Sequence, residues 1–207
     1  TGTVDAYAVH LQGSETESLN INISNNTISN YARGINIDQK TAVAAISSNT
    51  ITDLTGVTKN GNTYGSAIQL TKGTTLTVTG NTISTENVNA FHFYKGLDAD
   101  VTISSNTVKA PYLLWNEAGL DQSKITSADN TLTIANPDKA LTKSGAAEET
   151  TKIEGTVVGD VTVRVPSTEE TTGGQANPST GANDVVGIAA AAAVVAVLGS
   201  VTILRKQ

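Results

Sequence analysis

Few residues in this sequence combine side chains and spacings suited to chemistry, and the best candidates recur at matching positions of a repeated strand pattern. The candidate ligand-contacting residues are His10, Asn36, Asp38, Gln69, His92 and Tyr94. Histidine and carboxylate side chains are the usual general acids, general bases and metal ligands. His10 and His92 are three repeats apart, too far for one metal ion. We therefore predict a solvated polar face with no catalytic residue, no metal and no cofactor.

Composition excludes several other classes of site. The chain has 207 residues, no Cys, and 13 Lys and Arg against 19 Asp and Glu. A disulfide framework, a thiolate metal site and a cysteine nucleophile are therefore excluded. The acidic balance excludes the basic footprint of a nucleic-acid-binding protein. The chain contains no Met and shows no signal peptide, so we expect it to be the C-terminal part of a longer protein.

The elements that carry the candidate face come from an internal repeat. Phrases such as LNINISNNTI (19–28) and VTISSNTV (101–108) recur and align on an asparagine before threonine. This asparagine column comprises Asn26, Asn49, Asn81, Asn106 and Asn130. The long interval after Asn49 contains 57–66, which we interpret as an excursion loop. Stacking of repeats of this length indicates a solenoid.

A second strand pattern lies between these phrases and carries the candidate face. Apolar residues alternate along it with polar ones, which indicates strands with one buried side. Its predicted inward columns are Val9, Ile35, Ile68, Phe91 and Leu113, and then Leu11, Ile37, Leu70, Phe93 and Trp115. This alignment also places Leu114 and Asn116 on the outward side.

Residues 4–134 resemble the right-handed parallel β-helix repeats of the pectate-lyase-like superfamily, with their asparagine ladders. We therefore predict an all-β fold: a right-handed parallel β-helix of about five turns over 1–135. In such a coil the asparagine column would bond from turn to turn and take the left-handed backbone of the bends. The alternatives are an antiparallel β-sandwich and low-complexity disorder. The regular columns disfavour the sandwich, and the aligned aromatic residues disfavour disorder.

The resemblance also implies which catalytic residues an enzyme with this fold would require. Enzymes of this superfamily act on polysaccharides in a groove along an outer sheet. A lyase needs an Arg or Lys base and carboxylates that hold Ca²⁺, and a hydrolase needs two carboxylates. Arg33, Lys72 and Lys95 flank the candidate face, but Asp38 is its one acid.

Beyond the repeats the sequence changes character twice. Residues 136–165 are predicted to form cap strands over the end of the coil, with a hairpin around Gly159 and Asp160. Residues 166–176 have no apolar residue except Ala176, so we expect a polar linker.

The last 31 residues combine a short motif, an apolar span and a basic end. Asn177, Pro178, Ser179, Thr180 and Gly181 form the motif. Residues 185–204 carry no charge, and a helix of that length would cross a bilayer. Arg205 and Lys206 would remain on the cytoplasmic side. The alternative is a buried, alanine-rich soluble helix.

This arrangement resembles the LPxTG-type cell-wall sorting signal of Gram-positive bacteria. The resemblance implies that a sortase cysteine attacks the Thr180 carbonyl, that Gly181 onward leaves, and that Thr180 is joined to a peptidoglycan amine. Asn177 stands where the commonest motif has leucine, which leaves the sortase class open.

Taken together, these features predict the C-terminal part of a secreted, peptidoglycan-anchored surface protein, held transiently in the membrane. Its β-helix would serve as a stalk or as an adhesive, glycan-contacting surface. The expected partners are sortase, peptidoglycan, the membrane and an extracellular glycan or host surface. The alternative is a wall-anchored polysaccharide lyase or glycosidase whose catalytic turns lie upstream.

Overall fold

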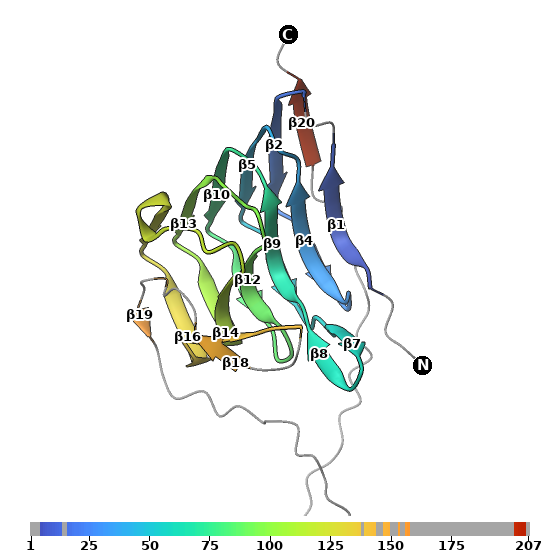
Figure 1. Ribbon diagram of the computed structural model, residues 1–207, viewed down its shortest axis with the longest axis vertical. Helices are drawn as coiled ribbons and strands as arrows, with labels where there is room; N and C mark the ends of the chain where they lie inside the picture. The colour runs from blue at the N-terminus through green and yellow to red at the C-terminus, as the bar shows by residue number, and fades with distance from the viewer. Residues whose placement is uncertain are drawn as a thin grey trace, which may run out of the picture. The chain divides into compact units, whose positions relative to one another are not determined.

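The computed structural model describes residues 5–13, 16–137, 139–143, 147–149, 153, 156–157 and 201–205. Within them the chain is almost entirely β-structure, wound into a coil of about five turns whose strands stack in parallel (Figure 1). A single turn of 3-10 helix, η1 (Gln122–Lys124), is capped by the Asp121 carboxylate, which accepts from the Ser123 amide at 2.8 Å.

Each turn of the coil contributes strands to three faces. The β12 face contains β1 (Tyr7–Gln12), β4 (Arg33–Asp38), β9 (Ser66–Lys72), β12 (Asn89–Phe93) and the end of β14 (Thr107–Asn116). The β11 face contains β3 (Thr27–Ser29), β6 (Thr50–Thr52), β11 (Thr82–Ser84), the beginning of β14, β16 (Thr131–Asn136) and β19 (Thr156–Val157). The β10 face contains β2 (Leu19–Ser24), β5 (Ala42–Ser47), β10 (Thr75–Thr79), β13 (Asp100–Ser104) and β15 (Ile125–Ala128).

The interior of the coil is filled by apolar residues that repeat from turn to turn. On the β10 face the paired column is Ile21, Ala44, Leu76, Val101 and Ile125, as the sequence predicts. On the β11 face it is Ile28, Ile51, Ile83, Val108 and Leu132. All ten are buried in one continuous core. A strand this short stabilises the coil only by stacking on its neighbours, because no turn has a core of its own.

The asparagine column forms a ladder inside the bend between the β10 and β11 faces. Each side-chain amide nitrogen donates to the Oδ1 of the next asparagine: Asn26 to Asn49 and Asn49 to Asn81 at 2.9 Å, Asn81 to Asn106 and Asn106 to Asn130 at 3.0 Å. The same Oδ1 atoms also accept the preceding rung's backbone amide at 3.0 Å. Turn-to-turn spacing is thus fixed by paired hydrogen bonds.

The predicted left-handed backbone of these asparagines is wrong by one residue. Positive φ occurs at the residue before each of them: Asn25, Ser48, Gly80, Ser105 and Asp129. The bend is made by this preceding residue, which leaves the ladder asparagine free to point its amide along the coil axis.

Two hairpins depart from the coil. The predicted excursion loop is an antiparallel pair, β7 (Val57–Lys59) and β8 (Asn62–Tyr64), joined through Asn60 and Gly61, both at positive φ. This Asn-Gly turn matches the twist of a two-residue hairpin. The second pair is β17 (Lys139–Leu141) with β18 (Ala147–Glu149), inside the predicted cap region.

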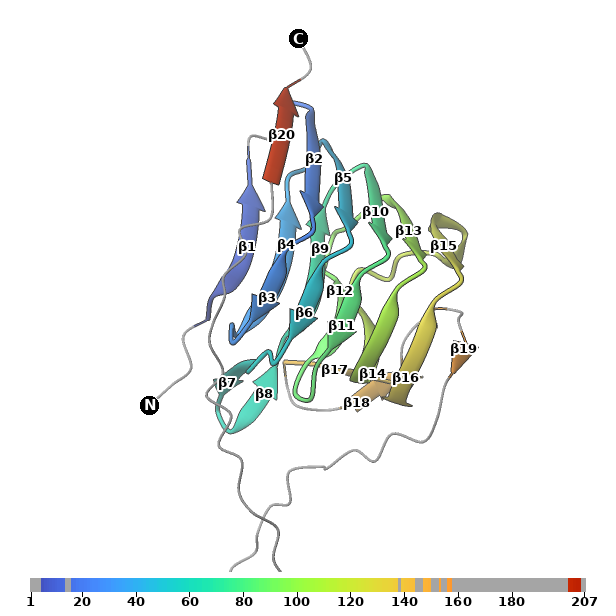
Figure 2. The same cartoon turned by 180° about the vertical axis from the view of Figure 1, so that it is seen from behind.

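The C-terminal predictions fall mostly outside the described residues. The Gly159 hairpin, the linker 166–176, the motif 177–181 and residues 185–200 of the apolar span all lie there. Residues 201–204 belong to strand β20 (Val201–Arg205), which pairs antiparallel with β2 (Figure 2). Among the described ranges, no helix is both long enough and apolar enough to cross a membrane.

Candidate functional site

The outward side of the β12 face places one residue of each turn in a single column. The strand pairing aligns His10, Asn36, Gln69, His92 and Trp115. The first four are predicted ligand-contacting residues, and Trp115 is added at the end of the column.

The predicted alignment of the last repeat is wrong, because Trp115 pairs with His92 and not with Phe93. Phe91 pairs with Leu114 and His92 with Trp115, so the true offset is one residue longer than predicted. Leu114 is fully buried and Trp115 faces outward beside His92. The prediction placed Trp115 inward because indole is apolar. Strand β14 instead runs on from the β11 face to the β12 face without a turn, which shifts the alternation.

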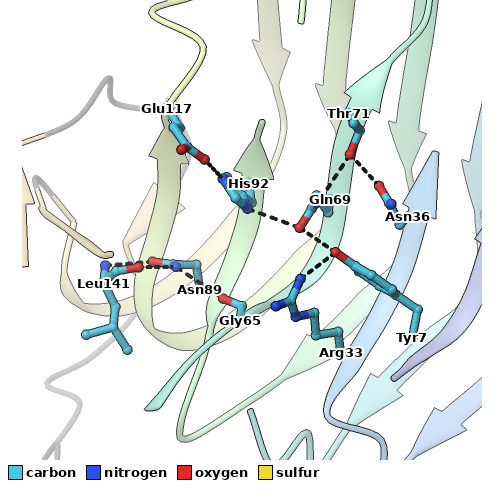
Figure 3. Close-up of polar contacts among 10 residues, drawn as sticks. All are labelled: Tyr7, Arg33, Asn36, Gly65, Gln69, Thr71, Asn89, His92, Glu117 and Leu141. Carbon is cyan, nitrogen blue, oxygen red and sulfur yellow. Dashed lines mark hydrogen bonds and ion pairs between the residues drawn. The ribbon is translucent and has the colours of Figure 1, made fainter. Parts of the chain in front are cut away.

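A chain of hydrogen bonds crosses this face from strand to strand (Figure 3). Arg33 donates to the Tyr7 hydroxyl at 2.5 Å, and Tyr7 donates to Gln69 Oε1 at 2.9 Å. The same oxygen lies 3.2 Å from His92 Nδ1, and His92 Nε2 lies 2.9 Å from Glu117 Oε2. Tyr7, Gln69 and His92 each bond to two partners in this network, which restricts their side-chain orientations.

A branch of this network satisfies two further polar side chains. The Gln69 amide nitrogen donates to the Thr71 hydroxyl at 2.9 Å, and Thr71 donates to Asn36 Oδ1 at 2.7 Å. At the other end Arg33 forms an ion pair with Asp5 at 3.1 Å. These polar residues therefore bond to one another across the turns.

The six candidate residues divide accordingly into two groups. Asn36, Gln69 and His92 are 3–4% exposed, so they support the face rather than present themselves to a ligand. Asp38 pairs with Lys72 at 3.4 Å. His10 is exposed and Tyr94 is partly exposed.

The accessible part of the site is aromatic. The Trp115 indole stacks on the His92 imidazole with centroids 4.2 Å apart and planes 5° apart. The Tyr94 ring meets the same imidazole edge-on at 5.5 Å. Trp115 and Tyr94 are each partly exposed, so two accessible rings contact one buried, hydrogen-bonded histidine. We call Tyr94 and Trp115 the aromatic platform.

Sequence reasoning missed Tyr7, Trp115 and Glu117 as members of this site. Tyr7 lies before the alternating residues Val9 and Leu11 on β1, and Glu117 follows β14, the last strand of the β12 face. Their side chains reach the column only because the strands stack in register, which a pattern within one repeat does not reveal.

Burial dominates the protonation of His92. Its pKa is lowered to about 3, first by burial and then by the positive charges of Lys143 and Arg33. The Glu117 carboxylate acts in the opposite sense. We expect the downward shift to prevail, since the ring is almost wholly removed from water.

This protonation can be measured in His10→Gln, which leaves His92 as the single histidine. We expect the His92 ring proton NMR shifts to stay constant from pH 8 down to about 4. The unfolded chain takes up this proton near pH 6.5 and the folded chain only near 3, so the free energy of unfolding should fall as pH drops through that window, by up to about 1.4 kcal/mol per unit. A midpoint at or above 6.5 would show that Glu117 outweighs burial.

Comparison with known proteins identifies a family. A family model described as "Periplasmic copper-binding protein (NosD)" matches residues 1–137. No curated protein and no solved structure matches the chain.

The residues present do not fit a copper ion. Copper in proteins is held by thiolate, thioether and imidazole ligands, and the sequence contains no Cys, no Met and two His. His10 and His92 are separated by β4 and β9 in their column, about 14 Å at the usual strand spacing. Both ring nitrogens of His92 already face protein oxygens. Among the described residues, no three His, Cys, Asp or Glu side chains form a group that could hold a metal.

The family match rests on the coil itself. It spans the strands from β1 to β16, which carry the ladder, the core columns and the outward face. Because the matched segment is more than half of the chain, this protein belongs to the NosD family of periplasmic copper-binding proteins.

Proposed function

We propose that this chain is a wall-anchored bacterial surface protein whose β-helix is a rigid stalk with a glycan-contacting surface on its β12 face. The family is described as periplasmic, which supports a surface or periplasmic protein. The ladder and the continuous core support the stalk, since both join each turn to the next.

The observation that carries the glycan-contacting role is the aromatic platform. Tyr94 and Trp115 are partly exposed on a face whose other outward residues are largely polar. Flat rings bordered by hydrogen-bonding groups suit a sugar, which has apolar ring faces and a rim of hydroxyls. Asn116 and Glu117, both partly exposed, border the platform.

The described residues give no comparable support to a lyase or glycosidase. His92 and Glu117 contact each other, and Arg33 is bonded to Tyr7 and Asp5. A general base must reach a substrate proton, and His92 is 4% exposed. We therefore propose that this hydrogen-bond network has a structural role and stabilises the β12 face.

Anchoring is proposed from the sequence of the last 31 residues. Sortase would recognise 177–181 while 185–204 holds the chain in the membrane, and Thr180 would pass to peptidoglycan. Residues 201–204 cannot form both strand β20 and the end of a membrane helix. We propose that the helix forms in the bilayer, where every backbone polar group needs a partner within its own segment.

Deletion of 185–207 tests the anchor. The full-length chain is expected in the wall fraction, and the deleted protein in the medium, because nothing then retains it near sortase. The measurement is immunodetection in wall, membrane and medium fractions. Wall retention of the deleted protein at the level of the full-length chain would contradict covalent anchoring through the C-terminal segment.

A further inference from the structure

A short segment of the chain crosses the β12 face and bonds there to a buried side chain of β12. We call residues 139–143 the strap. Asn89, which is fully buried, donates to the Leu141 carbonyl at 2.8 Å and accepts from the Leu141 amide at 2.9 Å (Figure 3). Asn89 also donates to the Gly65 carbonyl at 3.2 Å. The same amide thus holds the strap and the start of the underlying sheet.

The strap ends over the aromatic platform. Ala140 and Thr142 are buried against the coil, whereas Lys143 is exposed. The Lys143 ammonium lies 4.8 Å from the centre of the Tyr94 ring and 6.0 Å from that of the Trp115 ring. Both separations are within reach of a cation–π attraction. The Lys143 side chain therefore covers the surface that a ligand would contact.

The attachment of the strap differs from that of the neighbouring strands. Residues 139–141 follow β16, at the point where each earlier turn enters the β12 face. Strand β17 pairs there with β18 instead of with β14. It thus lacks the parallel ladder that joins β9, β12 and β14 to one another. A segment outside that ladder opens at lower free-energy cost than the strands within it.

We propose that the strap is a latch, held by Asn89, that closes the aromatic platform, and that the opened platform stacks a sugar ring of a polysaccharide. This inference rests on the proposed glycan-contacting function and adds its regulation. The platform needs no rearrangement on opening, because His92, Gln69 and Glu117 hold its base from below.

Trp115 is the one tryptophan of the chain, so its fluorescence reports on the platform alone. Acrylamide quenching is compared in wild type, Asn89→Ala and Leu141→Pro. Proline has no backbone N–H, so this substitution removes the hydrogen bond that residue 141 donates to Asn89 Oδ1. It leaves the side chains of the coil unchanged. Asn22→Ala, an exposed change on β2, is the matched control. We expect the quenching constant to rise about twofold or more in both latch variants and to stay unchanged in the control.

Polysaccharide binding is tested separately by affinity electrophoresis in gels containing hydroxyethyl cellulose or polygalacturonate. Migration in the same gel without polysaccharide corrects for charge. Leu141→Pro and Lys143→Gln should be retarded more than wild type, and Trp115→Ala in the Leu141→Pro background should lose the retardation.

The two measurements separate the latch from the function. Unchanged quenching in Leu141→Pro would overturn the latch, whatever the polysaccharide result. Increased quenching without retardation of any variant in either gel would overturn the sugar subsite and the glycan-contacting function together. Retardation of wild type equal to that of the latch variants would preserve glycan contact and overturn its control by the strap.

Discussion

Replacing Asn81 with leucine is expected to lower the free energy of unfolding by about 3–5 kcal/mol. The side chain donates to the Ile46 carbonyl at 2.9 Å and to Asn106 Oδ1 at 3.0 Å, and accepts from the Asn49 amides. Asn81 is 1% exposed. Leucine would remove these side-chain hydrogen bonds from buried partners in the middle of the stack, although Asn106 Oδ1 would still accept the backbone amide of residue 81.

Denaturant unfolding followed by circular dichroism measures this change. Asn22→Leu, an exposed asparagine on β2, controls for the same substitution at the surface and should change stability little. Asn81→Asp keeps the acceptor oxygen and loses the donor, so it should also destabilise. An Asn81→Leu midpoint equal to wild type would show that the ladder does not stabilise the coil.

Thr180→Ala is expected to abolish transfer to the cell wall and to leave the protein in the membrane fraction. Sortase as proposed recognises the Thr180 side chain before it attacks the adjoining carbonyl, and alanine lacks that side chain, whereas the apolar span is unchanged and still retains the chain. Ser179→Ala, at the variable position of the motif, is the matched control and should reach the wall. Equal wall fractions for Thr180→Ala and wild type would show that another attachment is used.

The regular part of the fold could be predicted because it repeats. Ile21, Ala44 and Leu76 pair across adjacent turns as the sequence columns predict, because each lies five residues before its ladder asparagine. The same logic failed at Trp115. The segment from Asn81 to Phe91 is longer than that from Asn106 to Leu114, so the asparagine spacing does not carry over to the next face.

The candidate site could be predicted only as a location. Alternation along the strands places His10, Asn36 and Gln69 on the outward side, where the structure has them. It does not show that Asn36 and Gln69 are buried, because burial there arises from bonds to other turns and to Tyr7. The strap was invisible for a related reason: 136–151 is polar and irregular, and its contact with Asn89 spans 52 residues.

If this β-helix is joined to peptidoglycan through Thr180, the mass of its C-terminal peptide reveals the linkage. Wall-bound protein is released with a muramidase and digested with trypsin, which cuts after Arg164 and next after Arg205. We predict a peptide covering 165–180 that carries a peptidoglycan fragment on Thr180. A wall-bound protein that instead yields the unmodified peptide 165–205 would contradict the claim.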